Sequence, residues 1–184
     1  RRKQKLLPKR KCNLSVNIAL TGTPGTGKTT LSRLLDFSVI SINDYYPKIS
    51  NGKDTEGNWL IDIDKMNKEI EVSSFSNTIF EGHTSHFLES LDVVVVLRCH
   101  PDKLKERLVV RKYNEEKLRE NLEAEALNII SEEAINEYGE RKVYELDTTS
   151  LDLNESKILL ENIISGNLKL NKRIDYSETI MEWY

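Results

Sequence analysis

Apolar and polar residues follow one another in short blocks whose period switches between that of a strand and that of a helix. Five runs of apolar and β-branched residues have the length of buried strands: 14–20, 39–42, 78–80, 93–97 and 142–146. Between them, apolar residues recur at three- and four-residue steps, as in amphipathic helices. Strands that alternate with helices are typical of an α/β fold with a parallel sheet covered on both faces. We therefore predict a three-layer fold with a five-stranded parallel sheet.

The helical pattern predicts five helices. They span residues 29–35, 63–70, 101–110, 115–138 and 153–164. Asp62 or Asp64 can cap the second helix, and Pro101 suits the first position of the third because its missing N–H costs nothing there. The segment 43–57 is rich in Asn, Asp, Gly and Lys, which predicts a loop.

The two ends differ from the body. Residues 1–13 form a basic N-terminal arm: seven of the 27 Lys and Arg residues lie within 1–11, which leaves 20 basic against 30 acidic residues elsewhere, a net charge of −10. We interpret this arm as flexible; the alternative is an arm that contacts phosphate backbones. The tail 167–184 is polar with a late apolar cluster, which predicts docking on the body. The domain proper is therefore expected at 14–166.

Composition narrows the class of protein. The chain has 184 residues, 38% hydrophobic and 31% charged, and no apolar run near the roughly 20 residues that cross a bilayer. We expect no membrane partner, and the acidic body argues against a DNA-binding surface. Cys12 and Cys99 lack the repeated Cys or His spacing of a metal site and are interpreted as idle thiols, so a cytoplasmic location is expected.

The strongest motif lies between the first strand and the first helix. Residues 22–29 match the P-loop pattern, with the glycines, the lysine and the threonine at the required spacing and in the required context. The glycines let backbone N–H groups approach a phosphate, Lys28 brings positive charge to the β/γ oxygens, and Thr29 offers a hydroxyl to Mg²⁺. We predict an ATP or ADP site. Its binding residues are Gly25, Thr26, Gly27, Lys28, Thr29 and Thr30.

The loop alone does not separate kinases from other nucleoside triphosphatases. A GTPase is expected to carry an Asn-Lys-x-Asp guanine reader after a late strand, whereas 145–149 reads Glu-Leu-Asp-Thr-Thr. Motor and AAA-type ATPases are usually longer. The short chain and its Thr-Pro-Gly loop favour a kinase for nucleotides or small metabolites.

Four segments resemble the adenylate kinase isoenzyme 6 family, most closely its archaeal branch. They are the loop at 21–30, the Phe-Glu-Gly-His run at 80–83, the Val-Leu-Arg run at 96–98 and the patterned stretch at 106–125. The resemblance covers about residues 14–165. It implies an adenylate-kinase-like core, a nucleoside-monophosphate-binding (NMP-binding) arm at about 43–66 and a short lid at about 110–120.

The resemblance also implies functions. They are phosphoryl transfer between ATP and AMP-like acceptors, a slower ATPase activity, and a role in maturation of the small ribosomal subunit. The implied partners are a platform ribosomal protein and pre-ribosomal RNA. This assembly role rests on the resemblance alone.

Matched position by position, the resemblance assigns further site residues. Glu81 corresponds to the acidic residue near Mg²⁺, which we expect it to contact through water. His83 corresponds to a histidine that orients the attacking water or the acceptor, with hydrogen bonding or general-base help as possible roles. Arg111 corresponds to a lid arginine that contacts ATP. With Lys28, these three make up the predicted catalytic residues.

Other charged residues are left with two interpretations. Arg107 and Arg98 could each serve the site or form a structural ion pair. For His86 and His100 we favour a loop histidine at the surface without a catalytic role.

The acceptor side departs from ordinary adenylate kinases, which hold AMP with an arginine after the second strand and an Arg-x-x-Gln motif near the third. This chain has Ser-Ile-Asn-Asp-Tyr-Tyr at 41–46 and Gly-His-Thr-Ser-His at 82–86. Two alternatives to an efficient AMP kinase therefore stay open. One is a nucleotide-switched assembly factor with little kinase activity, and the other is a kinase for another small hydroxyl substrate.

Overall fold

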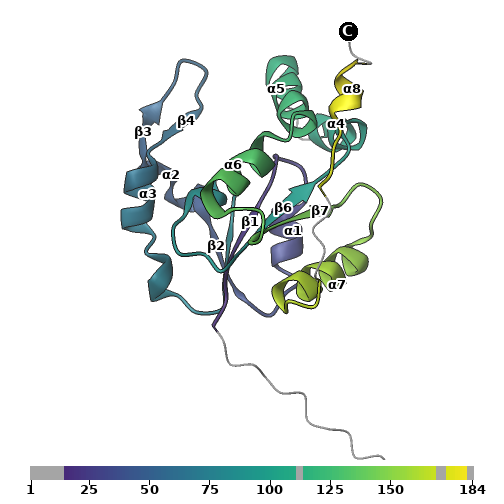
Figure 1. Ribbon diagram of the computed structural model, residues 1–184. Helices are drawn as coiled ribbons and strands as arrows, with labels where there is room; N and C mark the ends of the chain where they lie inside the picture. The colour runs from purple at the N-terminus through teal and green to yellow at the C-terminus, as the bar shows by residue number, and fades with distance from the viewer. Residues whose placement is uncertain (1–14, 111–113, 169–172, 182–184) are drawn as a thin grey trace, which may run out of the picture.

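The core of the computed structural model is one five-stranded sheet (Figure 1). The structure describes residues 15–110, 114–168 and 173–181. The sheet strands are β1 (Asn17–Thr21), β2 (Ser38–Ser41), β5 (Thr78–Glu81), β6 (Val93–Arg98) and β7 (Val143–Asp147). Their order is β2-β5-β1-β6-β7, and every neighbouring pair is parallel. The predicted five-stranded parallel sheet is confirmed.

Helices cover both faces of this sheet. Along β1, Ile18 and Leu20 pack with residues of α1 (Lys28–Ser32) and α7 (Leu153–Ile164). Ala19, between them, belongs to a core on the opposite face that includes α6 (Ile129–Tyr138). Because side chains alternate along a strand and both faces are covered, the central strands carry almost unbroken apolar runs. The result is the predicted three-layer architecture.

The segment after β2 folds into an arm beside the core, which includes a two-stranded antiparallel sheet (Figure 1). Its elements are η1 (Ile42–Tyr45), α2 (Tyr46–Ile49), β3 (Ser50–Lys53), β4 (Trp59–Ile61) and α3 (Ile63–Glu69). The loop predicted over 43–57 was therefore wrong in part. The hairpin gives no apolar alternation because its strands are mostly exposed, and its turn is held by Asp54, whose carboxylate accepts from the Glu56 and Asn58 amides. Asp62 is the cap of α3, accepting from the Lys65 amide at 3.0 Å.

The single helix predicted over 115–138 was also wrong. The chain forms α5 (Glu115–Ala126) and then α6, with Asn128 between them at φ 59°. Asparagine tolerates this left-handed conformation. Arg98 Nη2 donates to the Glu125 carbonyl at 2.9 Å and to Asn128 Oδ1 at 2.5 Å. A residue distant in sequence therefore supplies hydrogen-bond donors at the end of α5. The remaining elements are η2 (Val72–Ser74), η3 (Ser85–Phe87), α4 (Pro101–Val109) and α8 (Ser177–Met181).

The C-terminal segment at 173–181 lies against α5 and the end of β6 (Figure 1). Ile174 accepts from Arg98 Nη1 at 3.1 Å, and the Tyr176 ring lies 5.3 Å from the Arg98 guanidinium carbon. Within the part of the chain that the structure describes, no helix combines the length and the apolar character that crossing a bilayer requires.

Candidate active site

The predicted phosphate loop connects β1 to α1, at the carboxyl edge of the sheet. Gly22 has φ +133°, and a Cβ there would lie 2.3 Å from the Leu97 carbonyl oxygen, so only glycine fits. Gly27 has φ +105° and immediately precedes α1. Positive φ values at these positions explain why the motif needs glycine. The loop therefore ends at the amino terminus of a helix, an arrangement that favours phosphate binding.

Two predicted site residues at the start of α1 lie beside polar partners. Lys28 Nζ donates to the Gly22 and Thr23 carbonyls at 2.5 and 3.0 Å, so its ammonium group lies on the loop itself. Thr29 Oγ1 donates to Glu81 Oε2 at 3.0 Å. The structure thus brings together the hydroxyl and carboxylate that were predicted as metal-binding groups.

Oxygen ligands of this kind suit Mg²⁺, which keeps several waters and takes other ligands from substrate phosphates. Among the described residues, no group of three His, Cys, Asp or Glu could form an all-protein metal cage. The pair of Thr29 and Glu81 therefore fits a metal that arrives with a nucleotide.

His83 follows β5 and faces the same pocket. Its Nδ1 lies 3.1 Å from the Tyr46 hydroxyl, and the two rings meet edge to face at 5.9 Å. The side chain is open to the pocket, yet protein surrounds it on most sides. This desolvation, together with the positive charges of Lys28 and Lys117, lowers the pKa of His83 to about 4. The imidazole is therefore neutral at pH 7 and has a nitrogen lone pair.

A pocket of about 690 Å³ joins these groups, within the size range of small-molecule sites. The phosphate loop, Glu81 and His83 form one side. The arm and α5 form the other through Asn43, Tyr46, Trp59, Lys117 and Asn121. Lys117 Nζ also donates to Asn58 Oδ1 at 2.7 Å, which connects α5 to the hairpin turn across the pocket mouth.

A second pocket, of about 360 Å³, lies on the other side of the phosphate loop. Gly25, Gly27 and Thr30 line it together with Arg107 and Thr148. Arg107 donates to the Thr148 carbonyl at 2.7 Å and to its hydroxyl at 3.2 Å. Of the two interpretations open for Arg107, the structure favours the site, because the guanidinium is fixed at the wall of a pocket that borders the loop.

Arg98, in contrast, is a buried structural residue. Its side chain is 2% exposed and pairs with Glu125 at 2.7 Å and Glu145 at 3.1 Å. It lines neither of the two pockets beside the loop. The ion-pair interpretation of Arg98 therefore holds.

The other two histidines lie apart from the pocket. The expectation of a surface position was wrong for His86, which is fully buried and bonded to Thr21 Oγ1 at 3.0 Å and Glu133 at 3.2 Å. Burial lowers the pKa of His86 to about 4. His100 accepts from the Asp102 amide at 3.4 Å and so caps α4.

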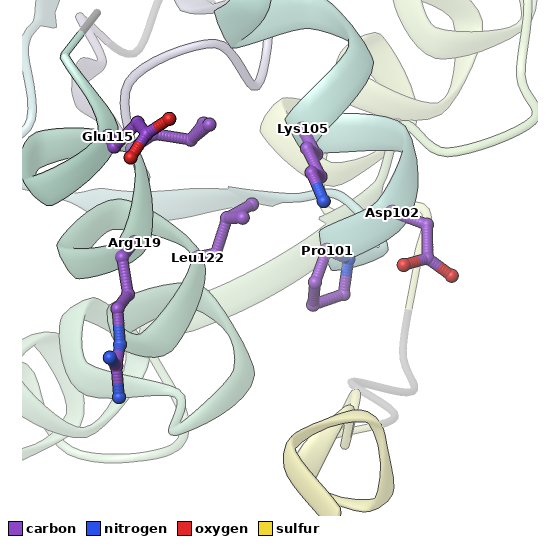
Figure 2. Close-up of a pocket in the computed structure, with 7 residues that line it drawn as sticks. Pro101, Asp102, Lys105, Glu115, Arg119 and Leu122 are labelled. Atoms are coloured by element: carbon purple, nitrogen blue, oxygen red, sulfur yellow. The ribbon is translucent and has the colours of Figure 1, made fainter. Parts of the chain in front are cut away.

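Figure 2 shows a third hollow, of about 300 Å³, between α4 and α5. Pro101 and Lys105 lie on one side of it and Arg119 and Leu122 on the other. None of the described residues that line it belongs to the phosphate loop, so it is separate from the candidate site.

Two of the predicted features lie outside the described residues. They are Arg111 and the whole basic arm at 1–13, which includes Cys12. Cys99 is buried, which raises its pKa to about 11 and keeps the thiol protonated.

Sequence reasoning did not pick out Tyr46, Trp59, Lys117 or Thr148 as site residues. The only signal for Tyr46 and Trp59 was an aromatic residue in a polar stretch, and Lys117 looked like one of many charges on an exposed helix.

Residues 18–128 match a protein-family model described as "AAA domain". An Archaeoglobus fulgidus protein described as "Putative adenylate kinase" is 41% identical over 170 residues, which cover 90% of this chain and 90% of that protein. A Methanococcus maripaludis protein with the same description is 39% identical over 166 residues, covering 83% and 89%.

Solved structures also match the fold. Thymidylate kinase from Candida albicans superimposes with a TM-score of 0.57 at 12% identity, covering 83% of this chain and 92% of that one. Shikimate kinase from Acinetobacter baumannii gives a TM-score of 0.55 at 19% identity, covering 85% and 97%. At such identities the likeness shows a shared fold and nothing about substrate.

Proposed function

This chain belongs to the family of the archaeal proteins described as putative adenylate kinases, and from that premise we propose that it is a nucleoside monophosphate kinase. The proposed reaction is ATP + AMP = 2 ADP, with slower ATP hydrolysis. One observation carries the proposal: the phosphate loop and the arm face a single pocket of about 690 Å³. A triphosphate on the loop and an acceptor on the arm would lie in one chamber, as in-line transfer requires.

ATP would bind across the loop. Its β- and γ-phosphates would contact the loop amides and Lys28, while its base would occupy the pocket beside Arg107 and Thr148. A guanidinium fixed by two hydrogen bonds offers a flat cationic face for stacking on a base. Arg111, four residues after Arg107 in the sequence, is proposed to contact ATP from the lid.

Thr29 and Glu81 would hold Mg²⁺, with Glu81 acting through water. When bound, the metal supplies charge stabilisation at the phosphate oxygens. Lys28 supplies further positive charge there.

His83 is proposed to orient the attacking group and to accept its proton. Burial raises the pKa of Tyr46 to about 12, so its hydroxyl stays protonated and can donate to His83 Nδ1. In that tautomer the ring proton is on Nε2, which would donate to the attacking oxygen and so orient it, without accepting its proton. In the opposite tautomer, Nδ1 donates to the tyrosine oxygen and Nε2 is the acceptor of the proton.

The acceptor would lie on the arm, which we propose as the NMP-binding element. Trp59 offers an aromatic ring on which a base could stack. Lys53 Nζ lies over this ring, 4.3 Å from its centroid. Among the described residues that line the pocket, the cations are Lys28 and Lys117, and none is arginine. One lysine holds a phosphate less specifically than an arginine fork. We therefore expect a broad and weak preference for AMP-like acceptors.

A coupled assay for ADP formation from ATP with AMP, dAMP or CMP tests the kinase proposal. With AMP, formation of two ADP per ATP consumed supports it; with dAMP or CMP, formation of one ADP and one dADP or CDP does. If no acceptor raises ADP formation above the rate with ATP alone, the kinase proposal is rejected. Only the proposed ATP hydrolysis is then left to test.

The lack of an acceptor arginine among the described lining residues favours a second candidate: a cytoplasmic factor in small-subunit ribosome maturation whose nucleotide state switches partner binding. Its support is otherwise the family resemblance. Residues 1–13 would then contact pre-ribosomal RNA. Pull-down of the cognate platform ribosomal protein should differ with and without ATP, and no binding in either state counts against this role.

A further inference from the structure

A buried polar cluster connects the phosphate loop to the C-terminal segment, and the proposed function does not use it. Its centre is Glu125, near the end of α5, at 2% exposure. Glu125 Oε2 accepts from the Thr23 hydroxyl in the loop at 2.5 Å. Glu125 Oε1 accepts from Arg98 Nε at 2.7 Å and from the Cys99 amide at 3.0 Å. One carboxylate therefore holds the phosphate loop and the end of β6 together.

Arg98 extends the cluster to the chain's last described segment. Its Nη1 donates to Glu145 at 3.1 Å and to the Ile174 carbonyl at 3.1 Å. The Ile174 amide donates in turn to the other oxygen of Glu145. The Tyr176 ring lies over the guanidinium. Residues 173–181 are thus fixed by the same arginine that Glu125 fixes.

The buried part of this cluster is Arg98 with its two carboxylate partners, Glu125 and Glu145. At the exposed edge, Arg173 Nε lies 3.5 Å from Glu145 Oε1, and Arg173 also pairs with Glu132. Buried ion pairs of this kind contribute little net stability but define one arrangement, because losing one partner leaves an uncompensated charge. A fully bonded network is therefore suited to fixing geometry.

Thr23 is where this network meets the nucleotide site. Its side chain is buried against Glu125, while its carbonyl accepts from Lys28 Nζ at 3.0 Å and from Thr26 Oγ1 at 2.9 Å. A shift of Thr23 would move the groups that position Lys28.

We propose that Glu125 is a positioning residue of the phosphate loop, and that through Arg98 it couples the loop to the C-terminal segment at 173–181. This inference rests on the proposed nucleotide binding. Coupling is reciprocal: docking of the segment raises nucleotide affinity, and nucleotide binding stabilises the docked segment.

The test uses the full chain and Mg·ADP. Thr23→Val keeps the shape of the side chain, removes only the hydroxyl donated to Glu125, and leaves the ion pairs intact. Titration calorimetry should show Mg·ADP affinity about tenfold weaker, and hydrogen exchange at the Ile174 amide should become faster. Thr23→Ser, which restores the hydroxyl, should restore both values.

A second variant tests the network from its far end. Tyr176→Leu lies outside both pockets beside the loop, yet should weaken Mg·ADP binding about fivefold. Val72→Ala serves as the control, because Val72 is buried at the opposite end of the sheet, where its carbonyl accepts from Asn17. It should lower stability without changing affinity.

The outcomes separate the two proposals. If the unaltered protein does not bind Mg·ADP, the proposed function fails and this inference with it. If it binds, but Thr23→Val and Tyr176→Leu bind equally well, only the coupling is overturned. Slower Ile174 exchange on adding Mg·ADP, lost in Thr23→Val, supports it.

Discussion

The phosphate loop and the arm face each other across one pocket but are built in opposite ways. Around the loop, Thr23, Thr26 and Glu81 are at most 4% exposed, and each has a fixed hydrogen-bond partner. On the arm, Trp59 and Leu60 are 37% and 49% exposed. The loop is therefore preorganised for one ligand group, whereas the arm can adjust to the acceptor.

This difference assigns two roles. Binding of a triphosphate needs donors and charges in fixed positions, which a rigid edge of the sheet supplies. Acceptor choice depends on the arm, where few contacts fix the side chains. Changes at the loop should abolish function, and changes on the arm should redirect it.

The largest expected effect is at Lys28. Lys28→Ala removes the ammonium group beside the phosphates, and the lost charge-assisted contacts are worth about 3–4 kcal/mol, or several hundredfold in ATP affinity. Titration with Mg·ATP measures it. Lys103→Ala, an exposed change on α4, should bind like the parent. Near-normal binding by Lys28→Ala contradicts the preorganised loop.

The next effect concerns turnover. His83→Gly should lower kcat about 100-fold, because a positioned acid–base group contributes at least that much, while ATP affinity is largely kept. Steady-state ATPase kinetics measure both quantities. His100→Asn is the matched control, since asparagine can also cap α4. A normal turnover rate in His83→Gly removes its catalytic assignment.

His86 should make the free energy of unfolding fall at acidic pH. Its pKa is about 4 in the folded protein against 6.5 in the unfolded chain. Its contribution to the free energy of unfolding is therefore complete above pH 6.5 and is lost as the pH falls toward 4. Between pH 7 and pH 5 the loss is about 2 kcal/mol. Glu133 and Thr21 are its bonded neighbours.

Urea unfolding at both pH values measures this loss. His86→Gln keeps hydrogen-bonding groups but does not titrate, so its stability should fall by about 2 kcal/mol less over the same range. Equal pH dependence in the two proteins would show that His86 does not titrate as described.

The smallest effect is expected on the arm. Trp59→Ala should raise the KM for AMP about tenfold, in line with the loss of one aromatic contact, and leave the KM for ATP unchanged. Leu60→Ala is the matched control, because Leu60 is the next residue on β4 and does not line the pocket. Equal changes in both KM values contradict separate roles for loop and arm.

The sheet and the loop were predictable because their signals are local. Short apolar runs specify buried strands, and the spacing from Gly22 to Thr29 specifies a phosphate cradle. The pairing of Thr29 with Glu81 followed from the resemblance. These features depend on residues close in sequence or on a motif.

The hairpin within the arm and the α5–α6 break could not be predicted from the residue pattern because their causes are distant or unpatterned. The break depends on Arg98, which lies 30 residues before Asn128 and bonds to it. The β3–β4 hairpin is too exposed to leave an apolar period. His86 gives no sequence sign that it is buried, since that follows from packing between η3 and α6.

The most direct test follows the γ-phosphate. The protein is incubated with Mg²⁺, γ-³²P-labelled ATP and unlabelled AMP, and the products are separated. We expect labelled ADP, formed from AMP and lost when Lys28 is replaced by alanine. Label found only in inorganic phosphate, with none in ADP, would contradict phosphoryl transfer across this pocket.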